Sequence, residues 1–244
     1  MIEPILLTTT RLETFSGPNL LTQATGFFFE RDGRLFLLTS RHVLIDEANG
    51  HLPDRLEIEL HIDPGNLALG TRFSIPLRTG TAPCWREGSD AGGMVDIAAV
   101  ELDRSALPPG LAYRAFTPGH LLPADAQAEV GTSLLVVGFP LGFQDTLHRT
   151  PVVRQAVIAS SFGFRFQGQG YFLTDARTHR GLSGAPVVMR QSSAERQLPG
   201  DLPWILLGVH SARLDILTRD QQVDEALGLN CAWYADMVMT LTDS

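Results

Sequence analysis

The sequence predicts an all-β protein, on three observations. Twenty-three glycines and 15 prolines among 244 residues favour many turns over long helices. The apolar runs have the length of strands and are bounded by turn residues. Apolar residues make up 44% of the chain, which is enough to build a core. All-β proteins of this length often form one unit, and we therefore expect a single all-β unit.

In the first half, the clearest elements are a hairpin and a half-buried strand. Thr25–Glu30 and Leu35–Thr39 flank a turn with Asp32-Gly33 at its tip, a strong hairpin signal. Leu56–Ile62 alternates apolar and polar residues, which is typical of a strand with one buried face. Residues 79–95 are rich in glycine, proline and serine, and we interpret them as a surface loop.

In the second half, a turn-rich connection over residues 107–123 precedes three apolar strands. These strands are predicted at residues 134–138, 152–158 and 205–210. Near the end, apolar side chains recur every four residues, at Leu229, Trp233, Met237 and Leu241. This spacing predicts one amphipathic C-terminal helix that packs on the sheet.

Charge and cysteine content restrict the partners and the compartment. The net charge of −8, without a basic cluster, argues against nucleic acid and anionic membranes as partners. Cys84 and Cys231 are well separated; pairing stays open, but such cysteines are more often thiols in a reducing compartment. Neither a signal peptide nor a run of transmembrane length is visible, so we expect a cytoplasmic protein.

Ser183 is the strongest candidate nucleophile. It lies in Gly181-Leu-Ser-Gly-Ala-Pro186, where glycines on both sides allow a sharp turn with exposed amides. The amides of Gly181 and Ser183 are then suited to hold an oxyanion while the hydroxyl attacks a carbonyl. The alternative on this segment alone is an ordinary glycine-proline turn.

A serine hydroxyl needs a base and a group that orients the base. His42 follows the apolar run that ends at Thr39, and Asp96 stands at the start of another run, 94–100. A carboxylate beside a core strand is costly unless something pairs with it. The alternative for His42 is a histidine that caps a strand. Weaker candidates are His51, His61, Asp90 and Asp103, of which the two aspartates are interpreted as solvated loop acids.

The order His42, Asp96, Ser183, with the flanks Thr39-Ser-Arg-His42, Asp96-Ile-Ala and Gly181–Pro186, resembles that of chymotrypsin-fold serine proteases. The resemblance is greatest to the compact bacterial trypsin-like peptidases, including the protease domain of the HtrA/Deg group. Further matching pieces span most of the chain: Gly138-Phe-Pro140, Leu173-Thr-Asp-Ala176 and Gly208-Val-His-Ser211. An α/β-hydrolase is rejected because its Gly-x-Ser-x-Gly elbow would need glycine at position 185, which is alanine.

This resemblance implies two six-stranded antiparallel Greek-key β-barrels with a C-terminal α-helix. Residues 1–118 would form the barrel with His42 and Asp96, and residues 119–244 the barrel with Ser183 and the helix. Asp96 would orient His42, which would act as base and then as acid for Ser183, and Gly181 and Ser183 would supply the oxyanion hole. The implied activity is that of a serine endopeptidase.

The resemblance also implies where specificity resides. Thr178, five residues before the serine, and His210 stand where glutamyl endopeptidases and picornaviral cysteine relatives carry Thr and His that bind a Glu or Gln side chain at P1. Both side chains can donate to a carboxylate or amide. The alternative is a core histidine and a turn residue. Asp175 is interpreted as a structural carboxylate that accepts backbone amides in the turn before Arg177.

Leu182 departs from the digestive relatives, whose aspartate there receives a newly cleaved N-terminus. We therefore expect a protease that is competent as synthesised, or that is controlled by loops or partners. A competing hypothesis is a catalytically quiescent protease-fold binding or sensor module that acts through a partner. No cofactor is expected, and no histidine or cysteine pair has metal-ligand spacing. The expected partners are protein or peptide substrates, with a regulatory protein left open; no attached peptide-binding PDZ domain is expected.

Overall fold

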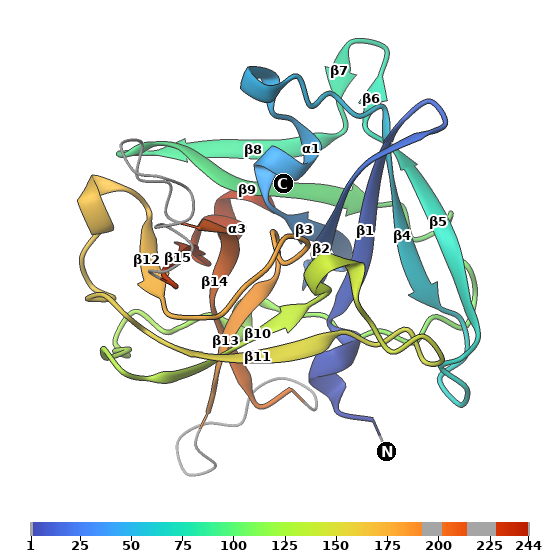
Figure 1. Ribbon diagram of the computed structural model, residues 1–244. Coiled ribbons are helices and arrows are strands. Elements are labelled where there is room, and N and C mark those ends of the chain that lie inside the picture. The colour runs from blue at the N-terminus through green and yellow to red at the C-terminus, as the bar shows by residue number, and fades with distance from the viewer. Residues whose placement is uncertain (1, 192–201, 214–227, 244) are drawn as a thin grey trace.

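The computed structural model describes residues 2–191, 202–213 and 228–243, and it is built around two antiparallel sheets, each of which curls on itself (Figure 1). The first sheet has the order β5-β4-β1-β2-β3-β9-β8. Its strands are β1 Thr9–Ser16, β2 Asn19–Arg31, β3 Arg34–Thr39, β4 Arg55–His61, β5 Gly70–Pro76, β8 Trp85–Asp90 and β9 Gly93–Leu102. A separate pair is formed by β6 Arg78–Thr79 and β7 Ala82–Pro83.

The second sheet has the order β11-β10-β13-β14-β15-β12. Its strands are β10 Ser133–Gly138, β11 Val152–Val157, β12 Tyr171–Thr174, β13 Pro186–Arg190, β14 Trp204–Arg213 and β15 Asn230–Tyr234. A bridge between Ile158 and Thr174 joins its two edges, which closes the curl. The predicted all-β, chymotrypsin-like fold of two curled sheets is confirmed. Over the residues that the structure describes, the second sheet has six strands, as predicted, but the first has seven.

Helices are short. They are α1 Arg41–Leu44 and α3 Met237–Leu241, with 3-10 turns η1 Pro4–Leu7, η2 Glu47–Asn49, η3 Pro118–His120, η4 Pro140–Gly142 and η5 Phe166–Gly168. Within the described ranges, no helix has the length and apolar character needed to cross a membrane. A helix does stand near the C-terminus, but it is much shorter than expected. Trp233 belongs to β15 and pairs with Val209 of β14, so the four-residue spacing ran across a strand as well as a helix.

Three predicted elements of the first half can be compared with the structure. The hairpin is present: Asp32 and Gly33 both have positive φ (51° and 76°), as a tight two-residue turn requires. β4 shows the predicted alternation of buried and part-buried residues. The expected loop over residues 79–95 is wrong, because most of this segment forms β7, β8 and the start of β9. Its polar residues occupy edge strands with one solvated face, where glycine and serine are tolerated.

The core consists of a cluster within each sheet and a third between them. The third cluster joins Phe27, Phe29 and Phe36 of the first sheet to Val137, Val188 and Leu206 of the second, and it includes Val238 of α3. All seven side chains are fully buried. Because this cluster draws on both sheets, it fixes how the two halves face each other, and it thereby positions the residues at their junction.

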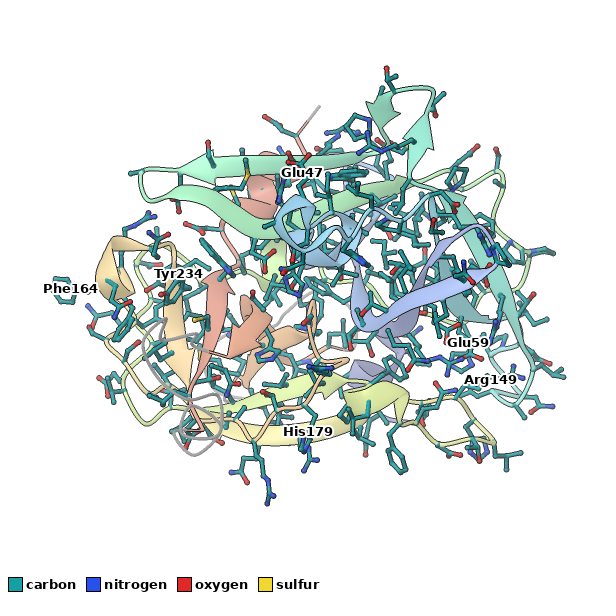
Figure 2. All side chains as sticks on the ribbon, turned by 45° about the horizontal axis from the view of Figure 1, so that its top comes forward. Glu47, Glu59, Arg149, Phe164, His179 and Tyr234 are labelled. Atoms are coloured by element: carbon teal, nitrogen blue, oxygen red, sulfur yellow. The ribbon has the colours of Figure 1, made fainter. Side chains whose placement is uncertain are left out.

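Polar contacts also fasten the halves together. Arg31 of β2 donates to the carbonyl of Met239 in α3 at 2.6 Å. The connection between β10 and β11 returns to the first sheet, where Arg149 pairs with Glu59 of β4 at 3.4 Å; the two lie side by side in Figure 2. The connection between the two sheets, residues 103–132, is irregular apart from η3, and the proposed boundary at residue 118 falls inside it.

Candidate active site

His42 and Asp96 meet because of the register between β3 and β9. Thr39 pairs with Ala98, and continuing this antiparallel register by two residues places Asp96 opposite the start of α1. The chain leaves β3 at Ser40 and turns into α1, which carries His42. His42 Nδ1 then lies 2.7 Å from Asp96 Oδ2, and the backbone amide of His42 donates to Asp96 Oδ1 at 2.8 Å. The carboxylate therefore grips both the ring and the backbone of His42.

The environment of His42 raises its pKa above the ordinary value. Burial acts in the opposite direction and is the largest single influence, but the hydrogen bond and charge of Asp96, with a smaller contribution from Asp46, outweigh it. The imidazolium form is thus stabilised in place. The ring is still 38% exposed, so a substrate can approach it.

The loop that carries Ser183 is fixed to the first sheet by Thr25 of β2. The amide of Thr25 donates to the carbonyl of Ser183 at 3.0 Å, and its hydroxyl donates to the carbonyl of Gly181 at 2.7 Å. Both hydrogen bonds cross the junction of the two sheets. These two hydrogen bonds therefore hold the half with Ser183 against the half with His42.

Two glycines of this loop are required by backbone geometry. Gly181 and Gly184 have φ values of +95° and +85°. A Cβ on Gly184 would collide with the carbonyl of Thr25 and the hydroxyl of Thr39, and one on Gly181 would collide with the carbonyl of Phe139. The close approach of the serine loop to its neighbours is the physical reason for both glycines.

The hydroxyl of Ser183 is directed to the carbonyl of Ser211 in β14, at 3.0 Å. Ser211 in turn donates from its own hydroxyl to Asp96 Oδ2. Over the described part of the chain, Ser183 makes no hydrogen bond to the His42 ring. The structure therefore brings His42 and Asp96 into direct contact and connects Ser183 to Asp96 through Ser211.

The amides predicted for an oxyanion hole are available. Among the residues that the structure describes, neither the N–H of Gly181 nor that of Ser183 has a hydrogen-bond partner. The carbonyl of Arg180, which precedes Gly181, accepts from the amide of Leu141 at 2.5 Å. That bond holds the peptide between Arg180 and Gly181 in one orientation and leaves the Gly181 amide free.

Thr178 and His210 are both buried beside this loop. The backbone of His210 is bonded to both residues that follow Ser183: its amide donates to Ala185 at 2.8 Å and its carbonyl accepts from Gly184 at 2.7 Å. Thr178 contacts Asn230 of β15 at 2.5 Å. Because the Asn230 amide nitrogen donates to the carbonyl of Ala176 at 2.6 Å, its oxygen faces Thr178, and the threonine hydroxyl must be the donor.

The imidazole of His210 is a buried polar group without a full set of partners. Its Nδ1 has no hydrogen-bond partner in the described structure, and its side chain belongs to a residue that is 3% exposed. Burial, with a smaller effect from a protonated His42, lowers the pKa of His210 to about 4. At neutral pH the ring is therefore uncharged and able to donate through only one nitrogen.

Ser211 and Asn230 are site residues that the sequence predictions did not single out. Ser211 stood in the matching piece Gly208–Ser211, which was the available signal, but its hydroxyl was given no role. Asn230 is a fully buried amide at the start of an otherwise apolar strand, an arrangement that is costly unless the amide is bonded. That pattern was the signal for a polar contact inside the second sheet.

The weaker candidates lie outside the site. His51 and His61 bond to the carbonyls of Val43 and Leu67, at 2.8 and 3.1 Å. Asp90 differs from its interpretation as a solvated loop acid, because it ends β8 and pairs with Arg165 at 2.5 Å. That pairing and an amide bond outweigh burial and lower the pKa of Asp90.

The remaining acidic residues and the cysteines have structural surroundings. Asp103 accepts from Ser105 at the turn after β9. Asp175 accepts the amide of Val157 at 2.7 Å, so it is a structural carboxylate, although its donor is on a neighbouring strand and not in its own turn. Cys84 and Cys231 are both free thiols. Among the described residues, no group of three metal-ligating side chains comes together.

Comparisons with known proteins agree with this architecture. A family model described as the trypsin-like peptidase domain matches residues 24–194. The crystal structure of the serine endoprotease from Yersinia pestis superposes with a TM-score of 0.55 at 16% identity, over 97% of this chain and 62% of that one. This chain thus spans less than two thirds of that protein, and at this identity the likeness is one of fold. No curated protein sequence matches. Since the family match covers most of the chain, including the segments with His42, Asp96 and Ser183, the chain belongs to the trypsin-like peptidase family.

Proposed function

We propose that this protein is a serine endopeptidase with Ser183 as nucleophile. His42 takes the Ser183 proton at Nε2 as Oγ bonds to the peptide carbonyl carbon, and the amides of Gly181 and Ser183 hold the oxyanion. The proton then passes from His42 to the leaving amine, and the acyl–Ser183 ester remains. Water, deprotonated by His42, hydrolyses that ester and restores the hydroxyl. Asp96 holds the ring in one tautomer throughout.

The observation that supports the proposal most strongly is that Asp96 binds both the ring and the backbone amide of His42. A carboxylate that binds both the ring nitrogen at 2.7 Å and the backbone amide at 2.8 Å fixes the ring and leaves Nε2 as the nitrogen that can take a proton. A histidine that only capped a strand would need no such partner. The two free amides beside Ser183 add the second requirement of acyl transfer.

Covalent labelling with a fluorophosphonate tests the proposal directly. We expect the probe to attach to Ser183, with loss of labelling in Ser183→Ala and a decrease of at least about 10³-fold in His42→Ala. His61→Ala is the matched control, because His61 bonds to the carbonyl of Leu67 and contacts none of the proposed catalytic residues, and it should label like the unaltered chain. Labelling of His42→Ala at the unaltered rate would contradict the proposed role of this histidine.

We further propose that the P1 pocket, with Thr178 and His210, accepts glutamine or glutamate and prefers glutamine at neutral pH. Thr178 gives its proton to Asn230, so its oxygen is left as an acceptor for a substrate N–H. An uncharged His210 supplies a single donor, which suits a carbonyl. A glutamine side chain can donate its N–H to the Thr178 oxygen and accept from His210 on its carbonyl. A glutamate carboxylate has no proton to donate, so its oxygen would face the Thr178 oxygen without a hydrogen bond.

A peptide set that differs only at P1 distinguishes these preferences. We expect kcat/KM to decrease in the order Gln, Glu, Leu, Arg. Thr178→Val keeps the shape and removes the acceptor, so it should lower kcat/KM for Gln about tenfold and leave Leu unchanged. A clear preference for Arg or for large aromatic residues would contradict the pocket assignment without affecting the nucleophile.

The orientation of the Ser183 hydroxyl favours a second candidate, a quiescent protease-fold module that acts through a partner. In this arrangement the hydroxyl donates to Ser211 and not to His42, so attack requires rotation of the side chain. A folded protein that fails to label at Ser183, under conditions in which trypsin labels fully, would favour this candidate over the peptidase.

We also propose that activity requires no new N-terminus. Leu182, where digestive relatives carry the aspartate that receives it, is fully buried in the core of the second sheet and offers no charge to an ammonium group. A short peptide fused to the N-terminus should therefore leave the rate of Ser183 labelling unchanged. Labelling that appears only after removal of the fusion would contradict this proposal.

A further inference from the structure

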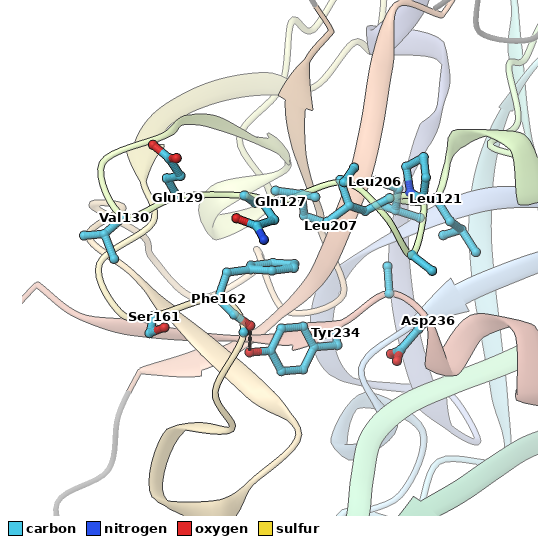
Figure 3. Close-up of a pocket in the computed structure, with 17 residues that line it drawn as sticks. Leu121, Gln127, Glu129, Val130, Ser161, Phe162, Leu206, Leu207, Tyr234 and Asp236 are labelled. Carbon is cyan, nitrogen blue, oxygen red and sulfur yellow. Dashed lines mark hydrogen bonds between the residues drawn. The ribbon is translucent and has the colours of Figure 1, made fainter.

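A cavity of about 690 Å³ lies away from the candidate catalytic residues, none of which lines it. It is bounded by the connection between the two sheets (residues 121–130), by residues 161–163 after β11, and by the adjacent parts of β14 and β15 (Figure 3). Its volume falls within the roughly 300–1,000 Å³ typical of small-molecule sites. No role in the proposed peptidase reaction accounts for it.

The floor of the cavity is apolar and fixed before any ligand arrives. The rings of Phe162 and Tyr234 stand 5.0 Å apart and perpendicular, and the Tyr234 hydroxyl donates to the carbonyl of Phe162 at 2.5 Å (Figure 3). Leu206 and Leu207 of β14 complete the wall. Since β14 lies inside the second sheet between β13 and β15, this wall is rigid. An apolar ring system has a preformed surface to stack on.

The charged side chains that line the cavity carry one sign. Glu129 and Asp236 line it from opposite ends, and Gln127, Ser161 and the Tyr234 hydroxyl also offer hydrogen bonds (Figure 3). No lysine, arginine or histidine is among the lining residues that the structure describes. Two carboxylates next to aromatic faces favour a cation and disfavour an anion.

We propose that this cavity binds a small molecule with an apolar, preferably aromatic, body and a cationic amine. The body would stack on Phe162 and Tyr234 against the β14 leucines, and the amine would reach Glu129 or Asp236. Both acids are exposed, so their attraction for the amine is moderate and weakens with salt. The apolar contact supplies most of the affinity, and the two carboxylates make the cavity prefer a positively charged ligand.

A matched pair of fluorescent probes tests the charge selectivity. Dansylcadaverine carries an aromatic body and a terminal ammonium, and dansyl-6-aminohexanoic acid replaces the ammonium with a carboxylate. We expect dansylcadaverine to bind with an increase and blue shift of its emission, and with a Kd at least about fivefold below that of the acid. Equal affinities, or no spectral change up to millimolar probe, would overturn the proposal.

Variants locate the binding. Ala128→Trp and Ala126→Trp, two independent ways to fill the cavity, should each abolish binding, while Ala106→Trp on a remote turn should not. The double variant Glu129→Gln/Asp236→Asn should bring the two probes within about twofold of each other. Its control is Asp32→Asn/Glu47→Gln, which removes the same charge elsewhere and should preserve the preference.

Two further outcomes would count against the proposal. Binding that survives both filling variants, in chains whose unfolding transition is unaltered, would place the probe elsewhere. Light scattering that shows a dimer in the unaltered chain and a monomer in Ala128→Trp would assign the cavity to a second copy of the chain. Because none of the lining residues belongs to the proposed triad, the test is independent of whether Ser183 reacts.

Discussion

The hydroxyl of Ser211 donates a hydrogen bond to the carboxylate of Asp96, although the two residues belong to different sheets. With the ring and the amide of His42, Ser211 is the third donor to this carboxylate. The same residue accepts the Ser183 hydroxyl on its carbonyl. Ser211 therefore connects the orientation of the base to the position of the nucleophile, and a change there should affect both.

In a plot of the rate of Ser183 labelling against pH, Ser211→Ala should shift the acidic limb to higher pH. The carboxylate of Asp96 loses a donor, so it attracts the His42 proton more strongly and raises the pKa of His42 further. Labelling needs the neutral ring, so it will begin at a higher pH and proceed about three- to tenfold more slowly at neutral pH. The measurement is the rate of fluorophosphonate labelling from about pH 5 to 9. An unmoved limb would show that Ser211 acts on Ser183 alone.

Asp96→Asn should have the opposite effect on the same limb and a much larger effect on rate. The hydrogen bond and charge that raise the pKa of His42 are removed while its burial remains, so the pKa of His42 falls. The asparagine amide also favours the wrong ring tautomer, which costs on the order of 10⁴ in rate in triads of this kind. Asp103→Asn serves as the matched control outside the site. A loss of rate below about tenfold would exclude Asp96 as the orienting group.

Local signals explain which elements of the fold were predictable. Asp32-Gly33 specifies a tight turn through backbone conformation alone, and the alternation in Leu56–Ile62 records a sheet with one buried face. The polar strand β8 gave no such signal, because it lies at the edge of its sheet. Trp233 and Met237 shared a four-residue spacing, yet the strand pairing of Trp233 with Val209 overrode it.

The same distinction applies to the site. Backbone demands and residue types marked Gly181 and Ser183 within one segment. His42 and Asp96 were marked by their positions beside apolar runs, and the family resemblance assigned their roles. Contacts between distant segments left little local trace: Ser211 reaches Asp96 across 115 residues, and Thr178 reaches Asn230 across 52. The direction of the Ser183 hydroxyl is likewise a property of the packed junction and not of the segment that carries it.

His210→Gln should reduce the sensitivity of the fold to acid. The pKa of His210 is about 4 in the folded chain against 6.5 ordinarily. Between these two pH values, His210 is therefore protonated in the unfolded chain and neutral in the folded chain. Stability is therefore lost as pH falls through this window and changes no further below it. Between pH 6.5 and about pH 5 the unaltered chain should lose roughly 2 kcal/mol more than the variant.

Urea unfolding at these two pH values measures the difference. His42, whose raised pKa acts in the opposite direction, is present in both chains and cancels. An equal loss of stability in both chains would mean that His210 is not held in its neutral form by burial.

Gly184→Ala should destabilise the junction between the two sheets as well as reduce the reactivity of Ser183. The added methyl group meets the carbonyl of Thr25 and the hydroxyl of Thr39, and the backbone has a φ of +85° that alanine rarely adopts. Thr25 also supports Ser183 through its amide, so relief of the collision displaces the nucleophile. We expect a loss of about 2–5 kcal/mol in the free energy of unfolding and of most Ser183 labelling.

The control is Gly163→Ala, which has open space around its Cβ and should stay within about 0.5 kcal/mol of the unaltered chain. Equal stability of the two variants, measured by urea unfolding, would show that the serine loop can move away from the first sheet at little cost.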